Sequence, residues 1–205
     1  MIDLSSMNQL YHDMFSTTRF RNLLILVFGM FMFMSCEEEA DLSRTFVMQQ
    51  GEHYASPRLV QSMQSNILNF TAKFNQSAVY HFEETAFQDS KNKLLGFSDC
   101  NSLHHENSAR FAWQWYNEQL EIYAYCYVNG VRQEKYIGAV ALDEENKYQL
   151  KITADSYVFQ LNHQEPVSIP RGTTCDKGLY YMLWPYFGGT LPAPHDVSIS
   201  IKIDY

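Results

Sequence analysis

The sequence has little positive charge. Its 205 residues include 15 Lys and Arg against 23 Asp and Glu, which gives a formal net charge of −8. Proteins that bind nucleic acid neutralise its phosphates with clustered Lys and Arg side chains. The acidic balance and the lack of a basic patch therefore argue against nucleic acid as a partner.

Motifs for metal binding and for common catalytic chemistries are also missing. The sequence contains no CxxC pair and no Cys/His pair at the spacing of a zinc site. It contains no GxSxG nucleophile motif. We therefore expect no structural metal and no cofactor, and the sequence assigns no catalytic residue.

No apolar run is long enough to cross a bilayer. The run LLILVFGMFMFM at residues 23–34 has 12 residues, whereas a membrane-spanning helix needs about 20. Arg19 and Arg21 precede this run, and Ser35 and Cys36 follow it, which is the arrangement of a cleaved export signal. An uncleaved anchor or a core segment is the alternative, but a buried helix would show polar positions at a period of 3.6 residues.

The residues FMSC at 33–36 resemble the lipobox of bacterial lipoproteins, in which the cysteine behind the cleavage site receives the lipid. This resemblance implies that residues 1–35 are a signal peptide and that Cys36 anchors the chain to a lipid bilayer. The acidic stretch EEEADLSR then begins a tether and N-terminal segment over residues 36–64. The expected location is the bacterial outer membrane, on the periplasmic or the cell-surface side.

Three cysteines remain if Cys36 is lipidated, and export would place them in an oxidising compartment. Cys126 lies in an alternating strand pattern and has the character of a small core residue. Cys100 and Cys175 lie in the loop-like stretches FSDCNS and TTCDKG. We therefore expect one disulfide, between Cys100 and Cys175.

Short runs rich in Tyr, Phe, Val and Ile recur from residue 65 onward, separated by Asn, Asp, Gly and Pro. Because no convincing amphipathic helix interrupts them, the pattern predicts an all-β domain over residues 65–205. The number of strands suits a two-sheet antiparallel β-sandwich or jelly roll. The predicted strands cover residues 67–74, 79–82, 93–97, 109–116, 119–128, 131–140, 148–154, 157–162, 167–169, 180–186 and 197–203.

The stretch ARFAWQWYNEQLEIYAYCYV tests the register of one hairpin. A two-residue turn at Asn117 and Glu118 would make one face of the hairpin wholly apolar. The residues then placed opposite each other are Trp115 and Leu120, Trp113 and Ile122, and Phe111 and Ala124. The second face is polar and aromatic.

A second tight turn at Asn129 and Gly130 extends the polar face onto a third strand. The pairs predicted there are Tyr125 with Glu134, Tyr123 with Tyr136, and Tyr127 with Arg132. The same register puts Gln133 and Lys135 on the apolar face. A β-bulge or an edge position for this strand would remove the conflict.

In KYQLKITADSYVFQLNHQEPVSI, a turn at Asp155 and Ser156 predicts Ile152 opposite Phe159 and Leu150 opposite Leu161. Following three long strands, this stretch resembles the late strands of concanavalin A-like jelly rolls, the architecture of many lectins, glucanases and polysaccharide lyases. The stretches LLGFSDCNSLHHENSARFAWQWYN and LWPYFGGTLPAPHDVSISIK resemble a family of lipoproteins of this fold whose function is uncharacterised. The resemblance covers residues 65–205 and carries no catalytic signature.

The polar face of the three strands is the predicted ligand site. Tyrosine rings stack on sugars, and nearby polar groups hydrogen-bond to sugar hydroxyls, so glycan is the expected ligand class. The predicted ligand-binding residues are Arg110, Gln114, Glu121, Tyr123, Tyr125, Glu134 and Tyr136. The alternative is that these side chains cover a solvated outer sheet of a structural or adhesion lipoprotein.

An enzyme is the remaining alternative. Glu121 and Glu134 are expected on adjacent strands, near enough for the paired carboxylates of a glycoside hydrolase, but the EXDXE-like alternation of concanavalin A-like glucanases is absent. In a polysaccharide lyase, Arg110 would neutralise a uronate. Tyr123, Tyr125 or His104 would take the proton. An acidic chain suits a polyanionic substrate only where positive charge is locally concentrated, so we rank binding above lyase activity.

Overall fold

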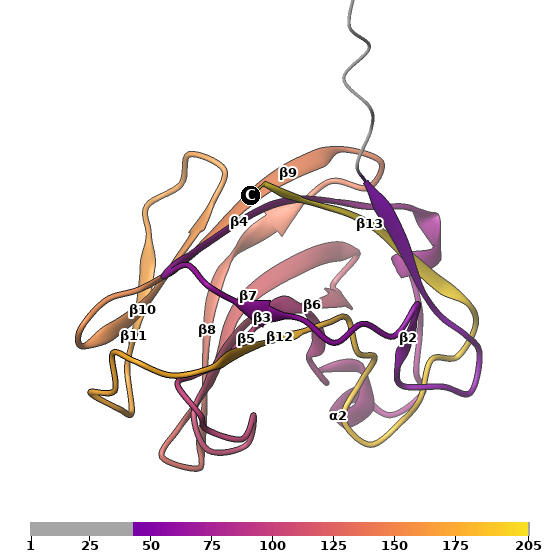
Figure 1. Ribbon diagram of the computed structural model, residues 1–205. Coiled ribbons are helices and arrows are strands. Elements are labelled where there is room, and N and C mark those ends of the chain that lie inside the picture. Colours follow the sequence, from indigo (N-terminus) through magenta and orange to yellow (C-terminus); the bar gives the residue numbers. More distant parts are fainter. Residues whose placement is uncertain (1–42, 205) are drawn as a thin grey trace, which may run out of the picture. The chain divides into compact units, whose positions relative to one another are not determined.

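The computed structural model describes residues 43–204, and nearly all of their regular structure is β (Figure 1). The two helical turns in this part of the chain are η1 (Gln76–Ala78) and α2 (Thr85–Gln88). The strands are β1 (Arg44–Met48), β2 (Ala55–Ser56), β3 (Ser62–Met63), β4 (Ile67–Phe74), β5 (Asn92–Ser98), β6 (Ser108–Tyr116), β7 (Gln119–Val128), β8 (Val131–Val140), β9 (Glu145–Ile152), β10 (Ser156–Leu161), β11 (Val167–Pro170), β12 (Tyr180–Leu183) and β13 (Val197–Asp204).

The strands form two antiparallel sheets. The seven-stranded sheet has the order β11-β10-β9-β4-β13-β1-β2, and the six-stranded sheet has the order β3-β12-β5-β6-β7-β8. Strands β5 to β8 follow one another in space as in the chain, whereas β4 lies between β9 and β13. The predicted all-β sandwich of two antiparallel sheets is therefore confirmed.

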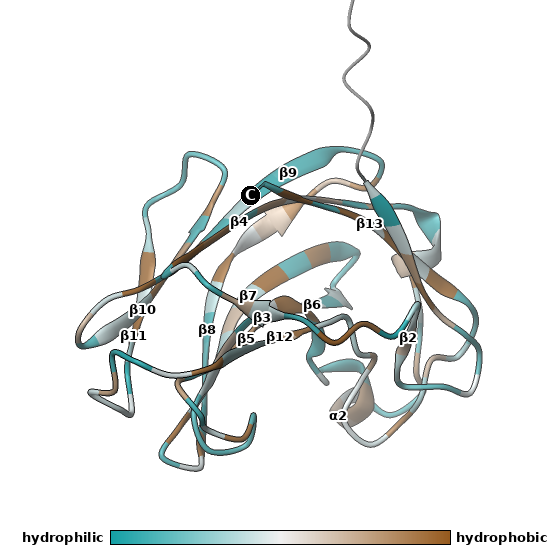
Figure 2. Cartoon of the chain, in the orientation of Figure 1, coloured by the Kyte–Doolittle hydropathy of each residue, from teal (hydrophilic) through white to brown (hydrophobic). Residues whose placement is uncertain are grey.

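Aromatic side chains fill the space between the sheets. Phe70 and Phe74 of β4 meet Phe111 and Trp113 of β6, with ring centroids 5.7 and 5.2 Å apart. Large aromatic rings bury more apolar area than other side chains and dominate such cores. Figure 2 shows polar and apolar segments alternating along the strands, which is the pattern of a sheet with one face in the core.

The hairpin of β6 and β7 has the predicted register. Trp115 lies opposite Leu120, and Trp113 lies opposite Ile122. Asn117 and Glu118 have φ angles of 48° and 58°, as expected for a two-residue turn whose twist matches that of the strands. The next turn, at Asn129 and Gly130, also has positive φ angles, and the three predicted pairs of β7 with β8 are all present.

Strand β8 resolves the conflict at Gln133 and Lys135 because it is an edge strand. The Nζ of Lys135 reaches the other sheet and donates to the carbonyl of Ser168 at 2.7 Å. A β-bulge follows, since Tyr123 pairs with Tyr136 whereas the neighbouring Ile122 pairs with Gly138. Strand β8 therefore has both the edge position and the β-bulge, either of which the sequence analysis offered as a way to remove the conflict.

The predicted register of the second hairpin is wrong by two residues. Ile152 lies opposite Tyr157, and Leu150 lies opposite Phe159. The turn closes earlier because the N–H of Thr153 donates to the carbonyl of Ser156 at 2.9 Å and the Thr153 hydroxyl accepts from the Ser156 N–H at 3.0 Å. A shift of two residues preserves which side chains face the core.

The segment 79–82 was predicted as a strand and has no regular structure. The side chain of Gln88 supplies the hydrogen bonds that a neighbouring strand would have given. Its Oε1 accepts from the Phe82 N–H at 2.7 Å, and its Nε2 donates to the Tyr80 carbonyl at 3.1 Å. The predicted strand 180–186 ends at Leu183, and Tyr186 forms only isolated bridges.

The predicted start of the sandwich at residue 65 is too late. Strands β1 to β3 lie within the segment 36–64 and belong to the two sheets, with β1 paired to β13. Phe46 and Met48 of β1 are buried in the core. The predicted signal peptide at residues 1–35 and Cys36 lie outside the described residues. Within residues 43–204, no helix is long and apolar enough to span a bilayer.

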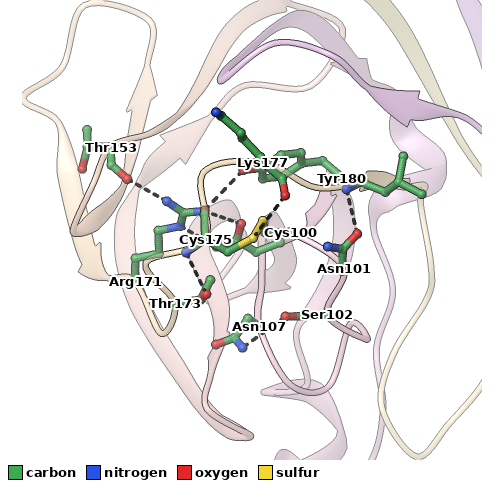
Figure 3. Close-up of a disulfide and its surroundings, with 12 residues drawn as sticks. Cys100, Asn101, Ser102, Asn107, Thr153, Arg171, Thr173, Cys175, Lys177 and Tyr180 are labelled. Atoms are coloured by element: carbon green, nitrogen blue, oxygen red, sulfur yellow. Dashed lines mark hydrogen bonds and ion pairs between the residues drawn. A yellow bond between two sulfur atoms is a disulfide. The ribbon is translucent and has the colours of Figure 1, made fainter.

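A disulfide (Figure 3) and a buried ion pair fasten the loops at one end of the sandwich. The disulfide joins Cys100 to Cys175, the pair expected from the sequence. Beside it, the guanidinium of Arg171 donates to both oxygens of Asp99 at 2.6 and 2.8 Å. Tyr157 donates to the same carboxylate at 2.6 Å. These contacts join the end of β5 to β10 and β11.

Candidate functional site

All seven predicted ligand-binding residues lie on β6, β7 and β8, on the face of the six-stranded sheet that points away from the core. The register places Arg110, Tyr125 and Glu134 in one row across the strands. The side chains at the alternate positions of β6 and β7, such as Phe111 and Ile122, point to the opposite face and are buried in the core. The tyrosine face, as we name it, consists of Arg110, Gln114, Glu121, Tyr123, Tyr125, Tyr127, Glu134, Tyr136 and Tyr181, together with Lys91, Lys93 and Tyr186 beside them.

One group of residues on this face is held by hydrogen bonds to Glu121. Gln114 Nε2 and the Tyr123 hydroxyl both donate to Glu121 Oε2 at 2.7 Å. Burial and the hydrogen bond to Glu121 raise the pKa of Tyr123. Tyr123 is therefore a protonated donor at neutral pH and a poor choice for the base that a lyase would need.

A second group surrounds the ring of Tyr125. The Nζ of Lys93 lies 5.0 Å from the ring centroid, and the Cζ of Arg110 lies 5.5 Å from it. Cations at this distance from an aromatic face are attracted by its electron density. Lys93 also donates to the carbonyls of Lys91 at 2.7 Å and Gly188 at 2.9 Å.

Lys93 belongs to the site although the sequence analysis did not include it. Lys93 lies opposite Ala112, and the register then shifts, so that Leu95 lies opposite Phe111. Both Leu94 and Leu95 are buried in the core. Strict alternation from Leu95 would have turned Lys93 inward, and the bulge turns it outward. A bulge of this kind has no clear signal in the sequence.

The backbone around Arg110 is shaped for that side chain. Gly96 lies opposite Arg110 on β5, and a Cβ at Gly96 would lie 2.6 Å from the Arg110 Cα and 2.8 Å from its Cγ. Tyr186 borders the group from the other side, where its N–H and carbonyl pair with those of Lys93 at 3.0 and 2.8 Å. Arg110 and Lys93 are each only 8% exposed.

Exposed rings lie around these groups. Tyr136 is 51% exposed and meets the Tyr123 ring edge-on, with centroids 5.5 Å apart. Tyr181, which is 44% exposed, extends the same face onto β12, because it pairs with Ser98 in the row that includes Tyr127. The exposed Tyr54 packs edge-on against Tyr186 at 5.0 Å.

The two glutamates of the predicted hydrolase alternative are too far apart. Glu121 lies opposite Ala139, whereas Glu134 lies opposite Tyr125. Four residues along β7 separate the two positions, a distance of roughly 13 Å at about 3.3 Å per residue. Paired carboxylates in glycosidases lie about 5 to 9.5 Å apart. Glu134 is also paired with Arg132, with Nε and Oε1 3.1 Å apart.

His104, the remaining candidate base, lies in the loop between β5 and β6 rather than on a strand. Its ring centroid is 3.8 Å from that of His105, and His105 meets Tyr127 edge-on. Burial and the neighbouring His105 lower the pKa of His104. Among the residues that the structure describes, no group of three His, Cys, Asp or Glu side chains could hold a metal ion.

An open depression lies apart from the predicted residues. Its volume is about 290 Å³, and it lies between α2 and the β6–β7 turn, next to His81, Tyr116 and Glu118. None of the seven predicted ligand-binding residues lines it.

Comparisons with known proteins identify the fold. No protein-family model and no curated protein sequence matches the chain. Among solved structures, alginate lyase AlyC3 has a TM-score of 0.55 at 9% identity, over 79% of this chain and 74% of that one. The laminarinase catalytic domain from Thermotoga maritima MSB8 has a TM-score of 0.54 at 8% identity, over 80% of this chain and 79% of that one.

The alginate lyase from Klebsiella pneumoniae has a TM-score of 0.50 at 11% identity, over 67% of this chain. The fold is a concanavalin A-like jelly roll. The match spans 58% of the Klebsiella enzyme, so the chain corresponds to little more than half the length of that protein. At these sequence identities the likeness establishes only the concanavalin A-like architecture. The function has to be inferred from the site.

Proposed function

We propose that this protein is a membrane-anchored lipoprotein that binds carbohydrate on the tyrosine face. The observation that carries the proposal is the difference between the outer faces of the two sheets. The face of the seven-stranded sheet that points away from the core bears no tyrosine on its three central strands. Its residues there are Ile67, Asn69, Thr71, Lys73, Glu145, Lys147, Gln149, Lys151, Ser198, Ser200, Lys202 and Asp204. The equivalent face of the six-stranded sheet bears six tyrosines, namely Tyr116, Tyr123, Tyr125, Tyr127, Tyr136 and Tyr181.

The chemistry of this face suits a sugar. Tyr136 and Tyr181 present rings on which the apolar face of a pyranose can stack. Beside them, Glu121 is already held by Gln114 and Tyr123 through Oε2, and its Oε1 makes no hydrogen bond within residues 43–204. A carboxylate oxygen accepts from sugar hydroxyls. Because these groups are fixed before binding, less side-chain entropy is lost when a ligand binds.

The anchoring part of the proposal rests on the resemblance of FMSC to a lipobox. If Cys36 carries the lipid, residues 37–43 connect it to β1. Seven residues extend at most about 25 Å, at 3.3 to 3.6 Å per residue. The domain would then work close to the outer membrane surface, on its periplasmic or outer side. The similarity to alginate lyases and a laminarinase agrees with a carbohydrate ligand.

A glycan-binding and depolymerisation screen of the detergent-solubilised chain tests the proposal. The variant Tyr136→Ala/Tyr181→Ala removes two exposed rings at little cost to the core, whereas truncation of the buried Tyr125 would also destabilise the sheet. We expect glycan binding without cleavage products and at least a tenfold loss of affinity in the variant. Lys151→Ala, on the outer face of the other sheet, is the matched control and retains full affinity.

Three results would contradict the proposal. Affinity that is the same in the double tyrosine variant as in the wild type would place the ligand elsewhere. Unsaturated products or new reducing ends would make the protein an enzyme. A complete absence of binding across neutral and acidic glycans would favour a structural role.

A further inference from the structure

The positive charges of Lys93 and Arg110 stand next to each other without a counter-ion. Both lie against the ring of Tyr125, at 5.0 and 5.5 Å from its centroid. The two side chains come from adjacent strands, β5 and β6, and both are more than nine-tenths buried. Adjacent buried charges of one sign repel each other, and each also loses its hydration.

The hydrogen bonds of this pair are incomplete. The Nε of Arg110 is buried and has no partner, and no hydrogen bond or ion pair to this guanidinium is formed within residues 43–204. The ammonium of Lys93 has three donors, and two of them bind the carbonyls of Lys91 and Gly188. A buried polar group without a partner is destabilising, and each one in a native structure needs an explanation.

The neighbouring acids form no ion pair with Lys93 or Arg110, although the charge of Glu134 acts to raise the pKa of Lys93. Glu134 lies in the same row as Arg110, but its Oε1 is bound by the exposed Arg132 at 3.1 Å. Asp89 is paired with Lys91 at 2.8 Å. The titratable and charged groups around Lys93 are Arg110 on β6, Tyr125 on β7, Arg132 and Glu134 on β8, and Tyr186 beside β5.

The pKa of Lys93 agrees with this arrangement. Burial, followed by the positive charge of Arg110, lowers the pKa of Lys93 to about 8. Lys93 is therefore still mainly charged at pH 7, but only at a free-energy cost. An anion bound between the two side chains would remove that cost and supply the missing hydrogen-bond acceptors.

We propose that Lys93 and Arg110 form an anion site that binds a carboxylate or sulfate group carried by the glycan. The guanidinium of Arg110 donates to the oxygens of this group, and the third N–H of Lys93 completes its coordination. The ligand of the tyrosine face is then an acidic polysaccharide. This inference rests on the proposed carbohydrate function for its biological meaning, although the anion site can be tested without any sugar.

The first arm of the test uses simple anions on the full chain in detergent, with 13C-labelled lysine and NMR detection of the Lys93 Cε signal. Sodium sulfate and sodium acetate are titrated against sodium chloride at constant ionic strength. We expect saturable shifts of the Lys93 signal and a rise of its pKa by at least half a unit with sulfate or acetate. Lys151, exposed on the other sheet, serves as the internal control and shows neither effect.

The variants Arg110→Gln and Arg110→Lys keep this arm falsifiable, because each is first checked for an unchanged fold by its amide spectrum. Loss of the saturable shift in Arg110→Gln, with partial retention in Arg110→Lys, supports the site. A shift that does not saturate, or one that is equal at Lys151 or in Arg110→Gln, overturns it, since it would report an adventitious ion only.

The second arm compares matched glycans. Oligogalacturonates are tested against their methyl esters, and dextran sulfate is tested against dextran. Tighter binding of either charged form by tenfold or more, lost in Arg110→Gln, supports the inference and distinguishes carboxylate from sulfate. Equal binding of charged and neutral forms overturns the anion site while the carbohydrate function stands. Saturable sulfate binding without affinity for any glycan would support the anion site and contradict the carbohydrate function.

Discussion

Two pairs of charged side chains are buried in this domain in unusual surroundings. Lys93 and Arg110 are buried on the tyrosine face without a counter-ion, whereas Asp99 and Arg171 are buried together at the end of the sandwich. Burying a charge is tolerated in a fold when it is paired or when it serves a site. The first pair therefore supports the proposed anion site, whereas the second pair joins the ends of strands in the fold.

The buried lysine predicts a particular dependence of stability on pH. The pKa of Lys93 falls from 10.5 to about 8 on folding, so the unfolded chain binds more protons between these values and stability rises with pH through this window. We expect Lys93→Met to be stabilising at pH 7 and much less so at pH 10. The difference between the two pH values is roughly 2 to 3 kcal/mol, at about 1.4 kcal/mol per pKa unit.

Urea unfolding of wild type and Lys93→Met at the two pH values measures this difference, and subtraction removes the titration of all other groups. An equal effect of the substitution at pH 7 and pH 10 would mean that Lys93 is hydrated and its charge is not penalised. The anion site would then lose its energetic basis.

For the Asp99–Arg171 pair, in contrast, we expect removal of one charge to destabilise the fold. In Asp99→Asn the Arg171 guanidinium loses both charged acceptors while it remains buried, so we expect the free energy of unfolding to fall by about 3 to 5 kcal/mol. Arg132→Gln breaks an exposed ion pair and should cost less than about 1 kcal/mol. Chemical denaturation of both variants measures the contrast. Similar costs for the two would show that the Asp99 site is accessible to water.

At the scale of strands and turns, the sequence predicted best where local chemistry decides the structure. The tight turns at Asn117 and at Asn129 set the register of β6, β7 and β8, and the alternation of apolar and polar residues agreed with it. The same pattern placed the seven predicted ligand-binding residues on one face.

Features decided by distant contacts were not predictable. The bulge that turns Lys93 outward depends on packing of both Leu94 and Leu95 in the core. The segment 79–82 looks like a strand, but the Gln88 side chain satisfies its backbone. The short β1 strand is stabilised by β13, which follows it by about 150 residues, so its own five residues carried too weak a pattern.

The Cys100–Cys175 disulfide is expected to stabilise the domain. It closes a loop with a sequence separation of 75 residues, for which the chain-entropy model gives about 4 kcal/mol of stabilisation. We expect Cys100→Ser/Cys175→Ser to lower the free energy of unfolding by 2 to 4 kcal/mol, as such removals typically do. Denaturation under oxidising conditions measures it, with Cys126→Ala as a thiol control that should not respond to reductant.

In the whole molecule, the two sheets present different outer faces. The seven-stranded sheet presents a polar, tyrosine-free outer face, whereas the six-stranded sheet presents the tyrosine face. The tyrosine face combines half-exposed aromatic rings with buried cations. Its retention on one sheet alone is the reason to regard it as a binding surface.

The proposed lipid anchor at Cys36 can be tested in cells. In a bacterial host fed radiolabelled palmitate, we expect the wild-type chain to be labelled and to fractionate with membranes. Cys36→Ser should abolish the label and leave the precursor uncleaved, whereas Cys126→Ser should remain labelled. A labelled Cys36→Ser chain would place the lipid on another residue, and an unlabelled wild type would exclude the lipoprotein.

The central claim is that a glycan binds to the tyrosine face, and spectra of the chain with 13C-labelled tyrosine rings test it most directly. On addition of an oligosaccharide selected in the screen, the account predicts shifts at Tyr123, Tyr136 and Tyr181. The core rings of Tyr148 and Tyr157 should not move. Shifts confined to Tyr116, beside the depression at the β6–β7 turn, or no shifts at saturating ligand, would contradict the claim and place the binding site elsewhere on the domain.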